Sequence, residues 1–107
     1  MIATLQPRAL PAVSPEVRAF AQENGVTDYL HPVLEMTRRL FAEATLCLCL
    51  EDDPEMLDDR HLVIGVRAPG MDIARAVDAR YQWHAGLYEC CPAPSVPVFR
   101  LALKSAS

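Results

Sequence analysis

The most informative stretch of the chain is residues 45–67, TLCLCLEDDPEMLDDRHLVIGVR. Apolar side chains occupy alternate positions at its start, TLCLCLE, and again at its end, RHLVIGVR. Alternation with a period of two is typical of a strand that buries one face. The acidic segment between the two runs contains a proline and has no strand pattern. We therefore predict a β-hairpin with strands at residues 45–51 and 60–67.

A helix and a third strand are predicted after this hairpin. The Pro-Gly pair at 69–70 is a turn signal, and Asp72 is suited to the N-cap of a long helix that reaches about Glu89. Alternating apolar residues at 96–104 predict the third strand. Because proline cannot donate to a hydrogen-bonded ladder, Pro97 favours an edge position for this strand.

Two amphipathic helices are predicted before the hairpin. Residues 14–16, Ser-Pro-Glu, combine a capping hydroxyl, a proline at the first helical position and an acid in the first turn, and Gly25 is suited to the helix end. The second helix is entered from Thr27, and Pro32 either kinks it or marks its start after His31. Its mainly apolar face carries Tyr29, Val33, Met36, Thr37, Leu40, Phe41 and Ala44.

These elements follow the order α-α-β-β-α-β. We interpret this order as an α+β two-layer sandwich, with all helices on one face of a three-stranded, mainly antiparallel sheet. If the connection from the second strand to the third skips one strand, the first strand lies at the centre and the strand order is 2-1-3. The chain of 107 residues is long enough for one domain with its own core. We expect that domain at residues 14–107, after an extended or disordered arm at residues 1–13.

Composition and charge exclude several classes of protein. With 51% apolar and 22% charged residues, the chain is not fully disordered. The net charge of −4 and the dispersed basic residues argue against a direct nucleic-acid partner. No apolar run is long enough to span a membrane, and the N-terminus lacks a signal-peptide pattern. We therefore expect a cytoplasmic protein without a membrane partner.

The four cysteines occur as two close pairs. Cys47 and Cys49 are two positions apart on a predicted strand, so their α-carbons lie about 7 Å apart, at or beyond the limit for a disulfide. Cys90 and Cys91 are adjacent and would close only a strained ring. A disulfide between the two pairs remains open, but a reduced cytosolic protein is the simpler interpretation.

Neither metal nor cofactor is predicted. The three histidines are isolated from one another and from the cysteine pairs, which does not match the ligand spacing of a zinc site. Five carboxylates gather at residues 52–59, but this segment lacks the central glycine and alternate-position spacing of a calcium loop. We interpret it as a solvated acidic turn.

The predicted sheet has two unlike faces. The leucine-rich face, which must hold the helices, carries Leu46, Leu48, Leu50, Leu62, Ile64, Val66, Phe99, Leu101 and Leu103. We call the opposite face the open face; its centre is small and apolar, and charged residues lie at its ends. Its candidate interaction residues are Cys47, Cys49, Val63, Gly65, Val98, Arg100 and Ala102. The alternative is an ordinary solvated face with scattered apolar side chains.

From this pattern we expect a homodimer that buries the open face. Glu51, Arg67, Arg100 and Lys104 would lie at the rim, where opposite charges can pair across a two-fold axis. The second choice for self-association is strand addition at the edge formed by residues 96–104.

The predicted helix at 72–89 carries a second candidate site. Its wide apolar arc consists of Ile73, Ala76, Val77, Tyr81, Trp83, Leu87 and Tyr88. Arg80 and His84 fall in the middle of this arc, one turn apart, and are expected to face the core. There His84 could be held neutral and act as an acid or base, while Arg80 binds an anionic group and Tyr81 or Tyr88 assists. The alternative is a structural Arg and His, both satisfied by hydrogen bonds.

The function expected from the sequence is that of a small cytosolic protein-interaction or regulatory module without catalytic activity. It is expected to form a homodimer or to bind another protein chain, because no nucleophile, phosphate-binding or metal motif is present and one sheet face has no cover. The alternative is a small enzyme that uses His84 as acid or base and Arg80 to hold an anionic substrate.

Overall fold

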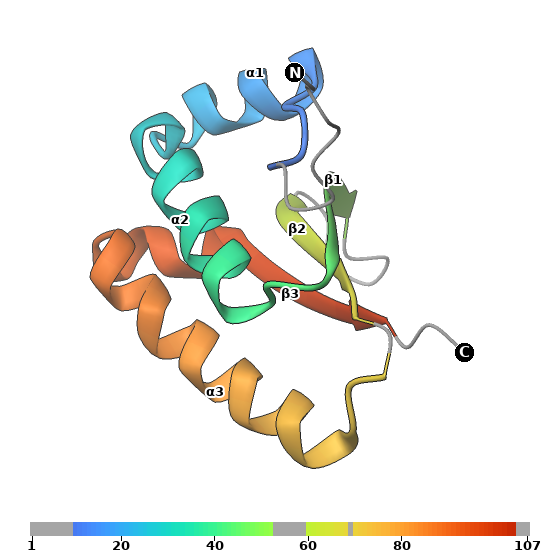
Figure 1. Ribbon diagram of the computed structural model, residues 1–107. Coiled ribbons are helices and arrows are strands. Elements are labelled where there is room, and N and C mark those ends of the chain that lie inside the picture. Colours follow the sequence, from blue (N-terminus) through green and yellow to red (C-terminus); the bar gives the residue numbers. More distant parts are fainter. Residues whose placement is uncertain (1–9, 53–59, 69, 105–107) are drawn as a thin grey trace, which may run out of the picture.

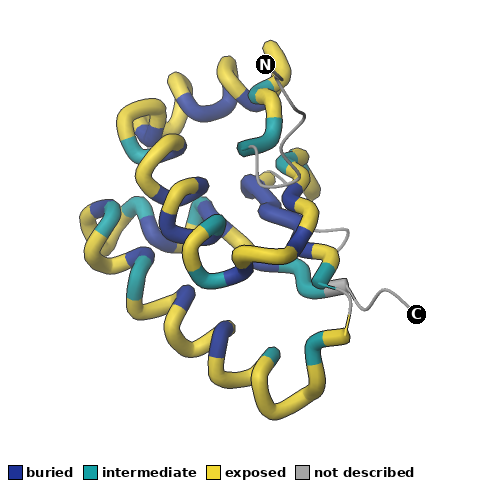
Figure 2. Tube along the Cα trace, viewed as in Figure 1, coloured by how far each residue is buried: buried dark blue, intermediate teal, exposed yellow. Residues whose placement is uncertain are grey.

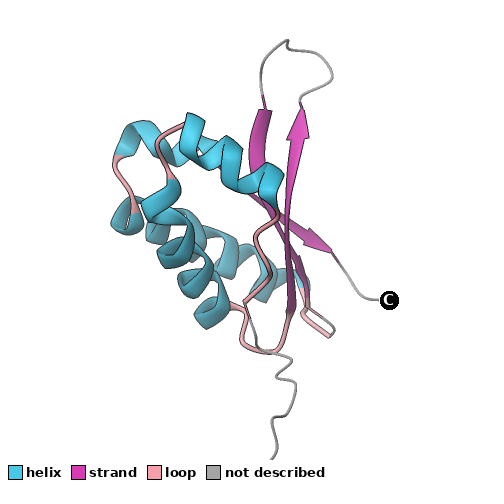
Figure 3. Ribbon diagram, turned by 90° about the horizontal axis from the view of Figure 1, so that it is seen from above, coloured by secondary structure: helices cyan, strands magenta, loops and turns pink. Residues whose placement is uncertain are grey.

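The α-helices of this protein lie together on one face of a three-stranded sheet (Figure 1 and Figure 3). The computed structural model describes residues 10–52, 60–68 and 70–104. Its elements are α1 (Pro15–Glu23), α2 (Thr27–Leu40), β1 (Thr45–Asp52), β2 (Arg60–Arg67), α3 (Ile73–Cys90), a 3₁₀ helix η1 (Ala93–Val98) and β3 (Phe99–Lys104). The predicted α+β two-layer architecture is confirmed.

The order of the strands differs from the predicted 2-1-3. The observed order is β1-β2-β3, with β1 antiparallel and β3 parallel to β2, so the sheet is mixed and β2 is central. The physical reason lies in β2 itself, which is buried at every position from His61 to Val66. Burial on both faces is typical of a central strand, and only a strand with neighbours on both sides achieves it. The edge position predicted for β3 is confirmed.

The pairing of β1 with β2 preserves the predicted division into two faces. Leu48 lies opposite Ile64, and Leu46 lies opposite Val66, on the face that holds the helices. Cys47 lies opposite Gly65 on the open face. A register shift by one residue would move the leucines to the open face, so the apolar pattern specifies this pairing.

The predicted helix starts agree with the observed caps. The Ser14 hydroxyl accepts a hydrogen bond from the Val17 N–H at 3.2 Å, and the Asp72 carboxylate accepts one from the Arg75 N–H at 2.8 Å. Gly25, at φ +67°, occupies the left-handed region that favours glycine, just after α1.

The prolines decide two of the predicted boundaries. α2 begins at Thr27, as predicted, and continues through Pro32 to Leu40, so Pro32 does not mark its start. The third strand begins at Phe99 rather than at residue 96, because the preceding proline-rich segment Ala93–Val98 forms a 3₁₀ helix. Residues 1–9 of the predicted arm and residues 53–59 of the acidic turn lie outside the described residues. Just before α1, Leu10 and Val13 pack against the core.

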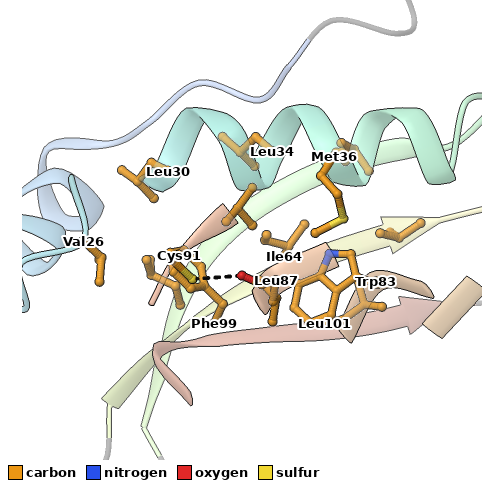
Figure 4. Close-up of a cluster of buried hydrophobic side chains, with 14 of the residues drawn as sticks. Val26, Leu30, Leu34, Met36, Ile64, Trp83, Leu87, Cys91, Phe99 and Leu101 are labelled. Carbon is orange, nitrogen blue, oxygen red and sulfur yellow. Dashed lines mark hydrogen bonds between the residues drawn. The ribbon is translucent and has the colours of Figure 1, made fainter. Parts of the chain in front are cut away.

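A buried hydrogen bond joins α2 to α3 inside the core. The Trp83 indole N–H donates to the Thr37 hydroxyl at 2.8 Å, and that hydroxyl donates to the Val33 carbonyl at 2.7 Å. Both Trp83 and Thr37 are fully buried. Figure 4 shows Trp83 among apolar side chains of α2 and the sheet, including Met36 and Leu101. The contact satisfies the polar atom of the largest side chain in the core.

We predict that Thr37→Val lowers the free energy of unfolding by about 1–3 kcal/mol, because it leaves the indole N–H of Trp83 buried without an acceptor. Denaturant unfolding followed by the fluorescence of this single tryptophan measures the change. Thr37→Ser keeps the hydroxyl and should cost less. Equal stability of the Val variant and the wild type would contradict the assignment.

Candidate interaction surface

The open face contains six of the seven predicted interaction residues in the expected positions on its strands. Among them Cys47, Cys49 and Arg100 are exposed, Ala102 is half-buried and Gly65 is buried. All α-helices lie on the opposite side of the sheet (Figure 3).

Two of the seven predicted interaction residues, Val63 and Val98, are less available. Val63 is on the open face, but it is only 5% exposed within the monomer. Val98 lies in η1, outside β3, and packs against the core, so its predicted place on the open face is wrong. The cause is the 3₁₀ helix, which ends the period-two alternation before Phe99. The open face therefore offers small side chains and little large apolar surface.

Close packing explains the glycine at the centre of the open face. A Cβ added to Gly65 would lie 2.5 Å from the Cys47 Sγ, so the thiol occupies the space that a side chain would take. Nearby, His61 is 8% exposed, and its Nδ1 has no hydrogen-bond partner among the described residues. The sequence did not distinguish His61, because its burial depends on the central position of β2.

The second candidate site, on α3, differs from the prediction in its orientation. Arg80 and His84 are both exposed, so the expectation that they face the core is wrong. The buried side of α3 is instead formed by Ala79, Trp83 and Leu87. The His84 ring meets the Trp83 ring edge-on, with centroids 5.2 Å apart. The core-facing position that motivated the catalytic hypothesis for His84 is therefore not observed.

The exposed part of the predicted apolar arc forms a stripe of its own. Ile73, Val77, Tyr81 and Tyr88 are 83%, 49%, 74% and 64% exposed, respectively, and we call them the α3 stripe. At 3.6 residues per turn, this stripe lies roughly 120° around the helix from the buried side chains. The predicted single apolar arc is therefore two surfaces, one buried and one exposed. Arg80 was the sequence feature that indicated two surfaces, because this charged residue lies at the boundary between them.

The α3 stripe lies on the flank of α3 that faces away from α2. On the α2 flank, a Cβ added to Gly86 would lie 2.9 Å from the Met36 Sδ, and the Cys90 thiol donates to the Pro32 carbonyl at 3.6 Å. These two contacts place α2 against this flank in the C-terminal half of α3.

The other flank of α3 borders the third strand. Ile73 and Ala76 line an apolar pocket of about 180 Å³ together with Val66 at the end of β2 and Leu103 of β3. The stripe therefore begins beside the edge strand of the sheet.

The first two turns of α3 lie outside the main core. The first buried residue of this helix is Ala79, seven positions after the Asp72 cap. Figure 1 shows these turns extending away from α1 and α2, and Figure 2 shows them mostly exposed. A helix start without buried side chains gains little from tertiary packing, so an additional contact there would stabilise it.

Charged and metal-binding features are sparse in the part of the chain that the structure describes. Arg60 donates to the Asp52 carboxylate at 2.8 Å, and this hydrogen bond holds the pKa of the carboxyl below its usual value. Within the described ranges, no group of three or more His, Cys, Asp or Glu side chains could hold a metal ion. None of the described helices is long and apolar enough to cross a bilayer.

The four cysteines are reduced thiols in two different environments. Cys47 and Cys49 are exposed on the open face, whereas Cys91 is buried and its thiol donates to the Leu87 carbonyl at 3.3 Å. Burial raises the pKa of the Cys90 and Cys91 thiols.

Comparison with known proteins identifies no relative. The chain matches no family model, no curated protein and no solved structure. The candidate surfaces therefore rest on the residues themselves.

We predict that a thiol reagent at neutral pH modifies Cys47 and Cys49 much faster than Cys91 in the folded protein. The thiolate is the reactive species, and a raised pKa together with burial lowers both its population and its access at Cys91. Mass spectrometry of timed samples measures each rate, and unfolded protein serves as the control, with all four thiols reacting. Cys91 labelling as fast as Cys47 would disprove the described packing.

Proposed function

We propose that this protein is a cytoplasmic protein-interaction module, without catalytic activity, that binds its partner through the α3 stripe. One observation carries the proposal: four large apolar side chains, Ile73, Val77, Tyr81 and Tyr88, are exposed on one side of one helix. A contiguous exposed apolar surface is typical of a protein contact, because burying it against a partner is favourable.

The side chains of the stripe suit a protein partner. Tyr81 and Tyr88 combine a large apolar ring with a hydroxyl that stays hydrogen-bonded at the wet rim of a contact, and tyrosine is enriched at interfaces for this reason. Ala74 and Ala85 lie beside the stripe and are small enough to let another backbone approach closely. The net charge of −4 supports a protein rather than a nucleic-acid partner.

Two earlier interpretations receive less support. A homodimer through the open face stays a prediction, but Val63 is already buried and Val98 packs against the core, so this face has less apolar surface to bury than α3. The enzyme that uses His84 and Arg80 also stays a prediction, but both side chains are exposed, so the core-facing placement that motivated it is wrong.

We predict that the double variant Val77→Asp with Tyr81→Asp weakens partner binding at least tenfold, because two charges would be buried at the centre of the contact. Its free energy of unfolding should change by no more than about 1 kcal/mol, since both side chains are exposed. Titration of the purified partner, or of the chain itself, against each variant gives the dissociation constants.

The matched control is Ala19→Asp with Gln22→Asp, which adds the same charge at two exposed positions of α1. The tagged wild type and the tagged control should retain the partner from a cell extract, whereas the α3 variant should not. This difference identifies the partner for the titration. Identical proteins and identical affinities for all three chains would rule the proposed function out.

A further inference from the structure

The α3 stripe begins beside β3, the edge strand of the described sheet. β2 pairs with one edge of β3, and within the described residues no strand pairs with the other edge. Ile73, the first residue of the stripe, shares a pocket with Leu103 of β3. The two layers of the fold therefore end together on this side, the sheet at β3 and the helices at α3.

This strand edge is open to pairing. An edge strand presents unpaired backbone N–H and C=O groups, which can pair with a strand of another chain. Phe99–Lys104 contains no proline, since Pro97 lies in the preceding 3₁₀ helix. The proline that favoured an edge position therefore does not block strand addition along β3 itself.

A single partner that covers both layers must itself present a free strand edge with an apolar helix flank above it. This chain has that arrangement. We infer, on the basis of the proposed function, that a second copy of this chain occupies the α3 stripe. The two copies pair β3 with β3 and pack α3 against α3. Such a contact is self-complementary and closes as a two-fold dimer.

The symmetry fixes how the helices meet. A two-fold axis perpendicular to the sheet makes the two β3 strands antiparallel and places both α3 helices antiparallel on the same face. The midpoint of the stripe falls between Arg80 and Tyr81. Ile73 of one copy then faces Tyr88 of the second copy, and Val77 faces His84. In each stripe the first half is aliphatic, with Ile73 and Val77, and the second half is aromatic, with Tyr81 and Tyr88. In the antiparallel pair the aliphatic half of one helix therefore faces the aromatic half of the other.

The charges on α3 are compatible with this contact. Arg75, Asp78 and Glu89 lie on the helix surface away from the stripe, so they stay in water. Arg80 lies close to the axis, where its guanidinium can stack on the Tyr81 ring of the second copy. This stacking offsets the approach of two like charges at the axis.

The first experiment measures the oligomeric state by sedimentation velocity. We expect a dimer for the wild type at tens of micromolar, a folded monomer for Val77→Asp with Tyr81→Asp, and a dimer for the Ala19→Asp, Gln22→Asp control. A monomeric wild type at 200 micromolar overturns this inference. If the monomeric wild type binds a different protein and the α3 variant does not, the proposed function stands without the dimer. If no binding depends on α3, both the proposed function and the dimer are wrong.

A second experiment locates the dimer contact by cross-linking. In a Cys47→Ser, Cys49→Ser background, Tyr81→Cys should give a covalent dimer with a short bis-maleimide, because the two positions lie near the axis. Gln82→Cys in the same background points to the solvent side of α3 and should remain monomeric on a denaturing gel. A wild-type dimer that cross-links through Cys47 or Cys49, with no cross-link at Tyr81→Cys, would instead assign the contact to the open face and overturn this inference.

Discussion

The hydrogen bond from the Trp83 indole to the Thr37 hydroxyl determines how α3 is rotated on the body of the protein. Both groups are fully buried, and the hydroxyl donates a hydrogen bond to the Val33 carbonyl, so every polar atom of the contact is satisfied. Turning α3 by one residue, about 100°, would rotate both Trp83 and Leu87 out of the core and break this hydrogen bond. The orientation of every other side chain on this helix follows from that constraint.

One result of this rotation is that α3 covers the core with only part of its apolar surface. The stripe that begins at Ile73 emerges beside β3, where the sheet ends. A fourth strand would lie beneath it, but β3 is the edge of the described sheet. The exposed stripe and the exposed strand edge thus meet at Ile73 and Leu103.

The two exposed surfaces of the protein differ in kind. The open face is tightly packed within the monomer, since the Cys47 thiol fills the space above Gly65 and Val63 is already buried. The α3 stripe consists of large side chains that stay largely exposed within the monomer. Because the favourable free energy of association grows with the apolar area removed from water, the stripe is the better candidate for a contact.

Local features of this protein were predictable because they depend on neighbours in the chain. Ser14 and Asp72 cap helices through hydrogen bonds to residues three positions later, and the alternation of Leu46 and Leu48 with cysteines assigns the faces of β1. The tertiary structure alone decided that β2 is central, because strand order depends on pairing between β2 and β3, far apart in the sequence. It alone also divided the apolar arc of α3 into a buried and an exposed side. Periodicity shows which residues share a side of a helix, but the packing partners, here Thr37 of α2 and the edge at β3, decide which side is covered.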